Sequence, residues 1–208
     1  MFDFVPISDY THYFDLMVLF LFLLAFWQCA SGNALKQNVV EFNAGWGFVL
    51  AVAIILYMGL RPVSGYFGDT VNYAARFEIY AKTPMKWVWG GEWLYYNIMH
   101  LFARNSNIHT FFLFCAILYV LPLWIAMHRI FGNYSYIPFL IVIGMFSFWN
   151  YGVNGIRNGI GASLIILAMT YVENIPIMTI LCILATGFHS SVYLMIGAGL
   201  MAWFIKNS

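Results

Sequence analysis

Long apolar runs, separated by short polar segments, dominate the chain. A membrane-spanning helix needs about 20 mostly apolar residues, and seven runs are candidates for such a helix. They cover residues 14–30, 46–60, 110–127, 137–149, 156–172, 175–188 and 192–205. Several of them are short for a full crossing, so we expect some helices to be broken. The pattern predicts an all-α fold in which residues 1–208 form a single, polytopic transmembrane helical bundle of about seven spans.

The segment 61–109 interrupts this series of apolar runs. Tyr73, Phe77 and Tyr80 recur at helical spacing, and a proline at position 84 ends that helix. Five aromatic residues follow at positions Trp87, Trp89, Trp93, Tyr95 and Tyr96. Aromatic side chains at this density suit the headgroup level of a bilayer. We therefore expect an amphipathic, aromatic-rich segment at the membrane surface, with residues 92–102 as a second interfacial helix. The alternative is an aromatic belt that only anchors the protein.

The composition does not fit a soluble protein. Hydrophobic residues make up 63% of the 208 residues and charged residues only 8%, whereas a soluble domain carries roughly 25% charged residues. A surface so poor in charge does not suit a soluble nucleotide-binding fold, a disulfide scaffold or a disordered chain. The net charge of +1 offers no basic surface for nucleic acid. The expected surroundings are a lipid bilayer.

The distribution of charge predicts an orientation in that bilayer. The first 35 residues contain three aspartates and no Lys or Arg, so they do not form a signal peptide, which begins with basic residues. Cations lie preferentially on the cytoplasmic side of a membrane. Because the first cation is Lys36, we expect an extracytoplasmic N-terminus and a first helix that runs inward. Alternation of the spans then places 61–109, the turn 150–157 and His189 on the extracytoplasmic face.

Three polar clusters stand out from the apolar background. In the first, Arg61 ends the second apolar run and Asp69 stands just before a helical pattern. An Arg at the end of a span is commonly a snorkelling anchor, and an Asp in this position commonly caps a helix or a turn. Taken one at a time, these two residues are better explained by structure than by function.

The second cluster surrounds Arg157. Asn154 and Asn158 lie four residues apart, which predicts that they share a helix face with Arg157 beside them. Free N–H groups at the start of a helix favour anions, and the fork of an Arg side chain matches phosphate. Gly155 and Gly159 permit close helix packing, so a packing seam with an interfacial Arg is the alternative. Asparagines together with an arginine favour a binding site.

The third cluster is His189-Ser190-Ser191, within an otherwise apolar stretch. A His between apolar runs is costly unless it has a partner, which makes it a functional candidate; a helix break with a satisfied structural His is the alternative. The predicted topology places all three clusters on one face. An acid, two arginines and an imidazole at one membrane surface can hold a phosphorylated lipid and move a proton.

The same motifs, in this order, resemble those of the EpsG family of bacterial membrane polysaccharide polymerases, which is related to the Wzy O-antigen and capsule polymerases. The resemblance covers most of the chain after about residue 50. It is carried by Gly59-Leu60-Arg61, Gly68-Asp69-Thr70-Val71-Asn72-Tyr73 with Phe77, Gly91-Glu92-Trp93-Leu94-Tyr95, Asn154-Gly155-Ile156-Arg157-Asn158-Gly159-Ile160-Gly161 and Phe188-His189-Ser190-Ser191. Asn158 stands where the family usually has Gln, and Gly161 where it usually has Ala. Family members are usually longer than this chain, so we expect a C-terminally truncated member.

The resemblance implies an integral-membrane enzyme that transfers a glycan from an undecaprenyl-diphosphate carrier to a sugar hydroxyl of an acceptor, in exopolysaccharide, capsule or O-antigen synthesis. It implies a multi-pass protein of the bacterial inner membrane, with an extracytoplasmic site and other polysaccharide-assembly proteins as partners. We expect Arg157 and Arg61 to bind the diphosphate, and His189 or Asp69 to take the acceptor proton. The other substrate-binding candidates are Asn154, Asn158, Tyr73, Glu92, Trp93, Tyr95 and Ser190. The chain has no D-x-D motif, so we expect no metal site and no cofactor.

Two functions of other classes remain as alternatives. The sequence Gly161-Ala162-Ser163 begins like the Gly-Ala-Ser-Gly motif of rhomboid intramembrane proteases, with His189 as the base. Leu164 stands where the second Gly of that motif belongs. A lipid or solute transporter would also contain polar groups on broken helices. Such groups lie near the midplane of the membrane, whereas the polar residues here cluster toward one face.

Overall fold

The structure is a computed structural model that describes residues 5–207, and within this range it contains helices and no strand. Three short 3-10 turns, η1 (Ile7–Asp9), η2 (Gly65–Phe67) and η3 (Gly132–Tyr134), accompany the α-helices. In chain order the α-helices are α1 (Tyr10–Ala30), α2 (Gln37–Gly59), α3 (Thr70–Lys82), α4 (Trp93–Asn105), α5 (Ile108–Phe131), α6 (Tyr136–Ile143), α7 (Phe146–Val153), α8 (Ile156–Met169), α9 (Ile175–Phe188) and α10 (Val192–Asn207). The all-α fold predicted from the apolar runs is confirmed.

Three helices in the described range are long and apolar enough to cross a membrane: Ile7–Ala30, which joins η1 to α1, then α2, and Ile108–Tyr134, which joins α5 to η3. Their mean hydropathies are 1.8, 2.0 and 2.2. The bent pair formed by α6 and α7 would be a fourth span. The helices α8 and α9 have 14 residues each. At about 1.5 Å per residue they are shorter than a hydrocarbon core of roughly 30 Å. With α10, they supply the remaining helices of the expected polytopic bundle.

The apolar run 137–149 contains one of the broken helices that the short apolar runs predict, because it divides into α6 and α7. The axes of α6 and α7 differ by 71°. Met145 has an extended backbone at the break, with φ −66° and ψ 136°. The preceding Gly144 packs so closely against α1 that a Cβ added to it would lie 2.5 Å from the ring of Phe22. The break therefore coincides with a close contact to another helix.

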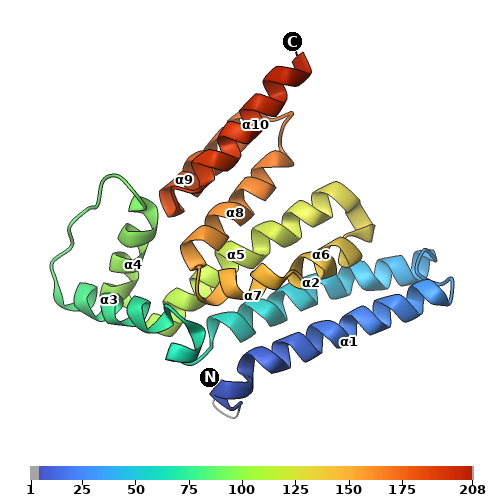
Figure 1. The fold of residues 1–208 in the computed structure, drawn as a ribbon, viewed down its shortest axis with the longest axis horizontal. Coiled ribbons are helices and arrows are strands. Elements are labelled where there is room, and N and C mark those ends of the chain that lie inside the picture. The colour runs from blue at the N-terminus through green and yellow to red at the C-terminus, as the bar shows by residue number, and fades with distance from the viewer. Residues whose placement is uncertain (1–4, 208) are drawn as a thin grey trace.

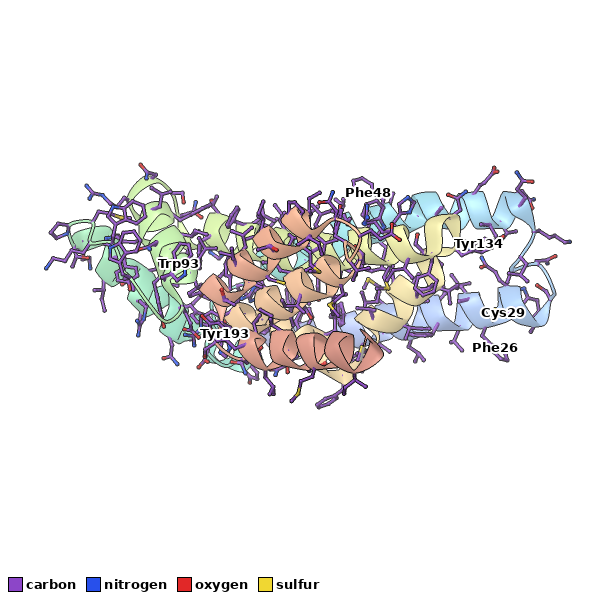
Figure 2. The ribbon with its side chains drawn as sticks, turned by 90° about the horizontal axis from the view of Figure 1, so that it is seen from above. Phe26, Cys29, Phe48, Trp93, Tyr134 and Tyr193 are labelled. Carbon is purple, nitrogen blue, oxygen red and sulfur yellow. The ribbon has the colours of Figure 1, made fainter. Side chains whose placement is uncertain are left out.

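The turn between α1 and α2 and the segment 61–109 lie at opposite ends of the molecule. Figure 1 shows α1 and α2 as a long hairpin, with α3 and α4 far from its turn. In Figure 2, seen from above, Cys29 near that turn and Trp93 of α4 lie at opposite ends. Between these ends, α5 packs against both α2 and α8, and α8 packs against α9. Alternation of the spans requires this separation, and the assignment of one end to the cytoplasm stays a prediction from the charge pattern.

The segment 61–109 contains the two helices that its aromatic pattern predicts. The inner face of α3 buries Thr70, Tyr73 and Phe77, and α4 packs beside it. The rings of Tyr80 on α3 and His100 on α4 stack, with their centroids 4.6 Å apart. The two amphipathic helices therefore share a buried seam.

The loop between α3 and α4 is held at one point and exposes its tryptophans. The side-chain amide of Asn97 donates to the Val88 carbonyl at 3.0 Å and accepts from the Val88 backbone N–H at 2.9 Å. Trp87 and Trp89 are 64% and 84% exposed. Indole rings prefer the headgroup level of a membrane, so this loop has the composition of a membrane-surface contact.

Candidate functional site

Two faces of α3 have different chemistry. The inner face carries the buried Thr70, Tyr73 and Phe77. A second face carries four residues at helical spacing, and all four line a cavity of about 430 Å³: Asp69, Asn72, Arg76 and Ile79. Tyr73, Ala75, Tyr96 of α4 and Arg157 of α8 complete its lining. One cavity, which we call the α3 cavity, therefore collects residues from three helices.

The junction between α7 and α8 holds α3 in place through Asn154. The side-chain oxygen of Asn154 accepts from the Asp69 backbone N–H at 2.8 Å, and its backbone carbonyl accepts from the Tyr73 hydroxyl at 2.8 Å. Burial raises the pKa of Tyr73, against the opposing effect of nearby Arg157, so this hydroxyl stays a donor. Gly68 has φ +60°, and a Cβ there would lie 2.4 Å from the Asn154 oxygen. The contact therefore requires glycine at position 68.

The prediction that Asn154 and Asn158 share a helix face is wrong. Asn154 is the residue after α7, and α8 begins only at Ile156, so the chain turns between the two asparagines. Asn154 supports α3, whereas the side-chain oxygen of Asn158 lies 2.8 Å from the Ser191 hydroxyl. The two residues thus have different partners: Asn154 contacts the start of α3, and Asn158 contacts the segment that follows α9.

A carboxylate joins three helices at the base of α4. Glu92 stands just before α4 and forms an ion pair with Arg157, the second residue of α8. Its other oxygen, Oε1, lies 3.3 Å from Nε2 of His189, the residue that follows α9. The hydroxyl of Tyr96 accepts from the same Arg157 nitrogen at 2.8 Å. The side chains of Arg157, His189 and Glu92 are 27%, 26% and 16% exposed, so the group lies at the edge of the packed core.

Both ring nitrogens of His189 have partners. Its Nδ1 accepts from the Ser191 backbone N–H at 3.1 Å and lies 2.8 Å from the Ser191 hydroxyl. A nitrogen that accepts from a backbone N–H carries no proton, so the hydrogen bonds assign the neutral ring proton to Nε2. That proton points toward Glu92. Neither ring nitrogen is directed to the α3 cavity, whose lining does not include His189.

Arg61 lies in the core and does not line the α3 cavity. Its side chain is 0% exposed, and its guanidinium donates to the Met58 carbonyl at 2.6 Å and to the Val153 carbonyl at 3.2 Å. It also lies over the ring of Phe112 at 4.4 Å. Burial lowers the pKa of Arg61 to about 10, so it remains charged at neutral pH. Arg61 therefore ties the end of α2 to the α7–α8 junction, in a position that differs both from a snorkelling anchor and from an exposed anion ligand.

The remaining candidates, Tyr95, Trp93 and Ser190, do not line the α3 cavity. Tyr95 is only 1% exposed and packs against Tyr73 and Phe111, so its ring is not accessible to a sugar. Trp93 packs on α9, where a Cβ added to Gly187 would lie 3.1 Å from the indole ring. Ser190 is exposed beside His189. The structure thus joins Asp69 and Tyr73 to Asn154 by hydrogen bonds. A second set of contacts joins Arg157 to Glu92 and His189, and Ser191 links His189 to Asn158.

Two residues of the site were not predicted from the sequence. Arg76 lines the α3 cavity, and its position four residues after Asn72 and seven after Asp69 was the available signal. Tyr96 lies four residues after Glu92, which places both beside Arg157. In residues 5–207, no group of three or more His, Cys, Asp or Glu side chains is arranged to hold a metal ion.

Comparison with known proteins gives one match. The model of the EpsG family matches residues 46–208, a range that includes every residue of the site described above. No curated protein and no solved structure matches the chain. The family resemblance indicated by the motifs is confirmed.

Proposed function

Because the chain belongs to the EpsG family, we propose that it transfers a glycan from an undecaprenyl-diphosphate carrier to a sugar hydroxyl of an acceptor glycan. The family and the apolar helices support a membrane-embedded polysaccharide polymerase in general. The carrier, the acceptor, the polymer class (exopolysaccharide, capsule or O-antigen) and an extracytoplasmic site in the bacterial inner membrane belong to the proposal. The observation that carries it is a single cavity lined by both Arg157 and Asp69.

The proposed reaction needs a cation and a base on the same cavity. The oxygen of the acceptor hydroxyl attacks the anomeric carbon of the donor glycan. The bond from that carbon to the phosphate oxygen breaks, and its electron pair leaves with the lipid diphosphate. Arg157 stabilises the negative charge that develops on this leaving group. The acceptor proton passes to the carboxylate of Asp69.

Between the two candidate bases, the geometry favours Asp69 over His189. The Asp69 side chain is exposed and lines the α3 cavity with Arg157, where an acceptor hydroxyl can reach it. The neutral His189 ring directs its proton to Glu92, and its other nitrogen accepts from Ser191. A base must present a free lone pair within hydrogen-bond reach of the substrate. His189 is therefore a positioning residue in this proposal.

The Glu92 carboxylate orients Arg157 for this role. It accepts from the Arg157 guanidinium and is itself held by His189 from the opposite side. A guanidinium fixed by a carboxylate and by Tyr96 presents its remaining N–H groups in one direction.

The protease alternative has no support in the geometry. Ser163 is 0% exposed, and its hydroxyl donates to the backbone carbonyls of Ile160 and Leu118 at 2.9 and 3.2 Å. A serine nucleophile needs a base within hydrogen-bond reach, and the partners of His189 are Glu92 and Ser191.

The proposal is tested with purified protein in lipid nanodiscs, an undecaprenyl-diphosphate oligosaccharide and a gel that resolves polymer length. Asp69→Asn should keep carrier binding and lower the transfer rate by about 100-fold or more, as expected for the loss of an acid–base group. Glu78→Gln is the matched control, because Glu78 is exposed on the same helix and does not line the cavity. Its transfer rate should equal that of the wild type.

Three results would contradict the proposal. Normal transfer by Asp69→Asn would remove Asp69 as the base. Loss of transfer with unchanged carrier binding in His189→Gln, at normal folded yield, would return that role to His189. Carrier binding by the wild type without any polymer growth in the presence of acceptor would favour a lipid transporter.

A further inference from the structure

The two arginines of the α3 cavity differ in how their charge is balanced. Arg157 shares its charge with Glu92 in an ion pair. Arg76 is exposed on α3, and among residues 5–207 it takes part in no ion pair. Asp69 adds a negative charge to the same cavity. The negative charges of Glu92 and Asp69 therefore offset the positive charge of Arg157. Arg76 adds a second positive charge to the cavity, and this charge is not paired with Glu92.

A tyrosine ring holds both guanidinium groups. The guanidinium carbon of Arg76 lies 5.0 Å from the centroid of the Tyr96 ring, and that of Arg157 lies 5.8 Å from the same centroid. Arg157 also donates to the Tyr96 hydroxyl at 2.8 Å. A cation near an aromatic face is attracted by the ring and loses side-chain freedom. The two arginines thus contact the same ring and line the same cavity, although their helices come from distant parts of the chain.

We infer that Arg76 and Arg157 together bind the diphosphate group of the substrate, with Arg76 as the second anion-binding residue of the site. This inference rests on the proposed function and identifies the residues that hold its leaving group. Two guanidinium forks match the oxygens of two linked phosphates, because each fork can donate two parallel hydrogen bonds. Arg61 does not take this position, since its guanidinium is buried against backbone carbonyls.

The rim of the cavity suits a diphosphate that is attached to a lipid. Ile79 follows Arg76 by three residues on the same face, lines the cavity and is 59% exposed. An apolar side chain beside the exposed cation gives a surface for the first units of a lipid chain. A water-soluble diphosphate would contact the two arginines and gain nothing from Ile79. Comparing the affinities for a lipid-linked and for a water-soluble diphosphate therefore shows which of the two supplies the diphosphate group that the site binds.

The test measures the affinity of purified protein for undecaprenyl diphosphate in nanodiscs of neutral phospholipid, and for inorganic pyrophosphate in solution. Arg76→Gln should weaken binding of the lipid diphosphate by about 10-fold or more, because it removes charge-assisted hydrogen bonds. Lys82→Gln is the matched control: it removes the same charge from the same helix, and Lys82 is exposed and does not line the cavity. It should change the affinity by less than about 2-fold. Thermal unfolding of each variant checks that it is folded.

The outcomes separate this inference from the proposed function. Wild-type affinity of Arg76→Gln for the lipid diphosphate overturns the inference and leaves the proposed function standing. An equal loss in Lys82→Gln also overturns it, because the effect would then come from surface charge in general. If the wild type binds pyrophosphate through Arg76 but does not bind the lipid form, the anion site stands and the proposed function fails. If the wild type binds neither ligand, both fail.

Discussion

The replacement Glu92→Gln tests whether one carboxylate holds the site together. Glu92 accepts from Arg157 with one oxygen and faces Nε2 of His189 with the other. A glutamine has the same shape but only one oxygen acceptor, and its NH₂ group is a donor. Arg157 and His189 both present donors to residue 92. In one of the two contacts, the NH₂ group of the glutamine must therefore face another donor, and no hydrogen bond can form there. The variant therefore loses one charge-assisted contact and the neutralisation of Arg157.

The size of the effect follows from these contacts. A hydrogen bond to a charged group contributes about 1.5–3 kcal/mol when it is shielded from water. The three side chains are 16–27% exposed, so solvent screening places the expected loss near the lower end, at about 2 kcal/mol. For a chain of this length, that corresponds to a Tm lower by about 4–8 °C. Carrier affinity should fall as well, since Arg157 loses the group that orients it.

The assay combines thermal unfolding in nanodiscs with a double-mutant cycle. Glu92→Gln, His189→Gln and the double variant are compared, and Glu78→Gln serves as the control for loss of one acidic charge. If the two residues act through their contact, the double variant should be more stable than the sum of the single losses predicts, by about 0.5–3 kcal/mol. A Glu92→Gln variant with the wild-type Tm, or strictly additive losses, would refute the role given to this carboxylate.

Three further results are expected. Arg157→Lys keeps the charge but loses the planar fork, so polymer synthesis in cells that lack their own polymerase should fall by about 10-fold or more, and full-length polymer would exclude the diphosphate role. Gly68→Ala forces a Cβ into a positive-φ position against the Asn154 side chain. It should lower stability by at least about 1 kcal/mol, measured by thermal unfolding with Gly65→Ala, which meets open space, as control. In a background without native cysteines, an impermeant thiol reagent should label Asn72→Cys and Ser190→Cys on intact cells and Asn38→Cys only after lysis. Any other pattern would contradict the predicted orientation.

The sequence predicted well those helices that depend on a pattern of neighbouring residues along the chain. The apolar runs 14–30, 46–60 and 110–127 became parts of α1, α2 and α5, and two residues of the aromatic stripe at 73–80, Tyr73 and Phe77, lie on the buried face of α3. The break in 137–149 was not located, because the run is apolar on both sides of it. Its position coincides with the contact between Gly144 and Phe22, and no short-range pattern encodes a contact across more than 100 residues.

The site residues also divide into those that short motifs predicted and those whose positions depend on long-range packing. The motifs placed Asp69, Arg157 and His189 near one another, and the structure gathers them around the starts of α3, α4 and α8. The partner of His189 could not be read from the motifs, because Glu92 lies 97 positions upstream of it and meets it only through helix packing. Arg61 looked like a surface cation at the end of a span, but the Val153 carbonyl that holds it is 92 residues away. Arg76 was within reach of helical periodicity, since Asp69, Asn72 and Arg76 share one face.

The exposed face of α3 has a consequence for product length. Asp69, Asn72, Arg76 and Ile79 are all exposed while they line the cavity, so the cavity is an open trough along the side of a helix. A growing glycan that lies in a trough can leave sideways after any addition, whereas a chain threaded through a tunnel can leave only by its end. If the chain polymerises as proposed, the number of repeats in its product is set by the ratio of the transfer rate to the rate of sideways release. Products should then form a broad ladder of lengths on a gel. Substitutions that weaken binding of the glycan in the trough should shift that ladder toward shorter polymers, while neighbouring bands should still differ by one repeat.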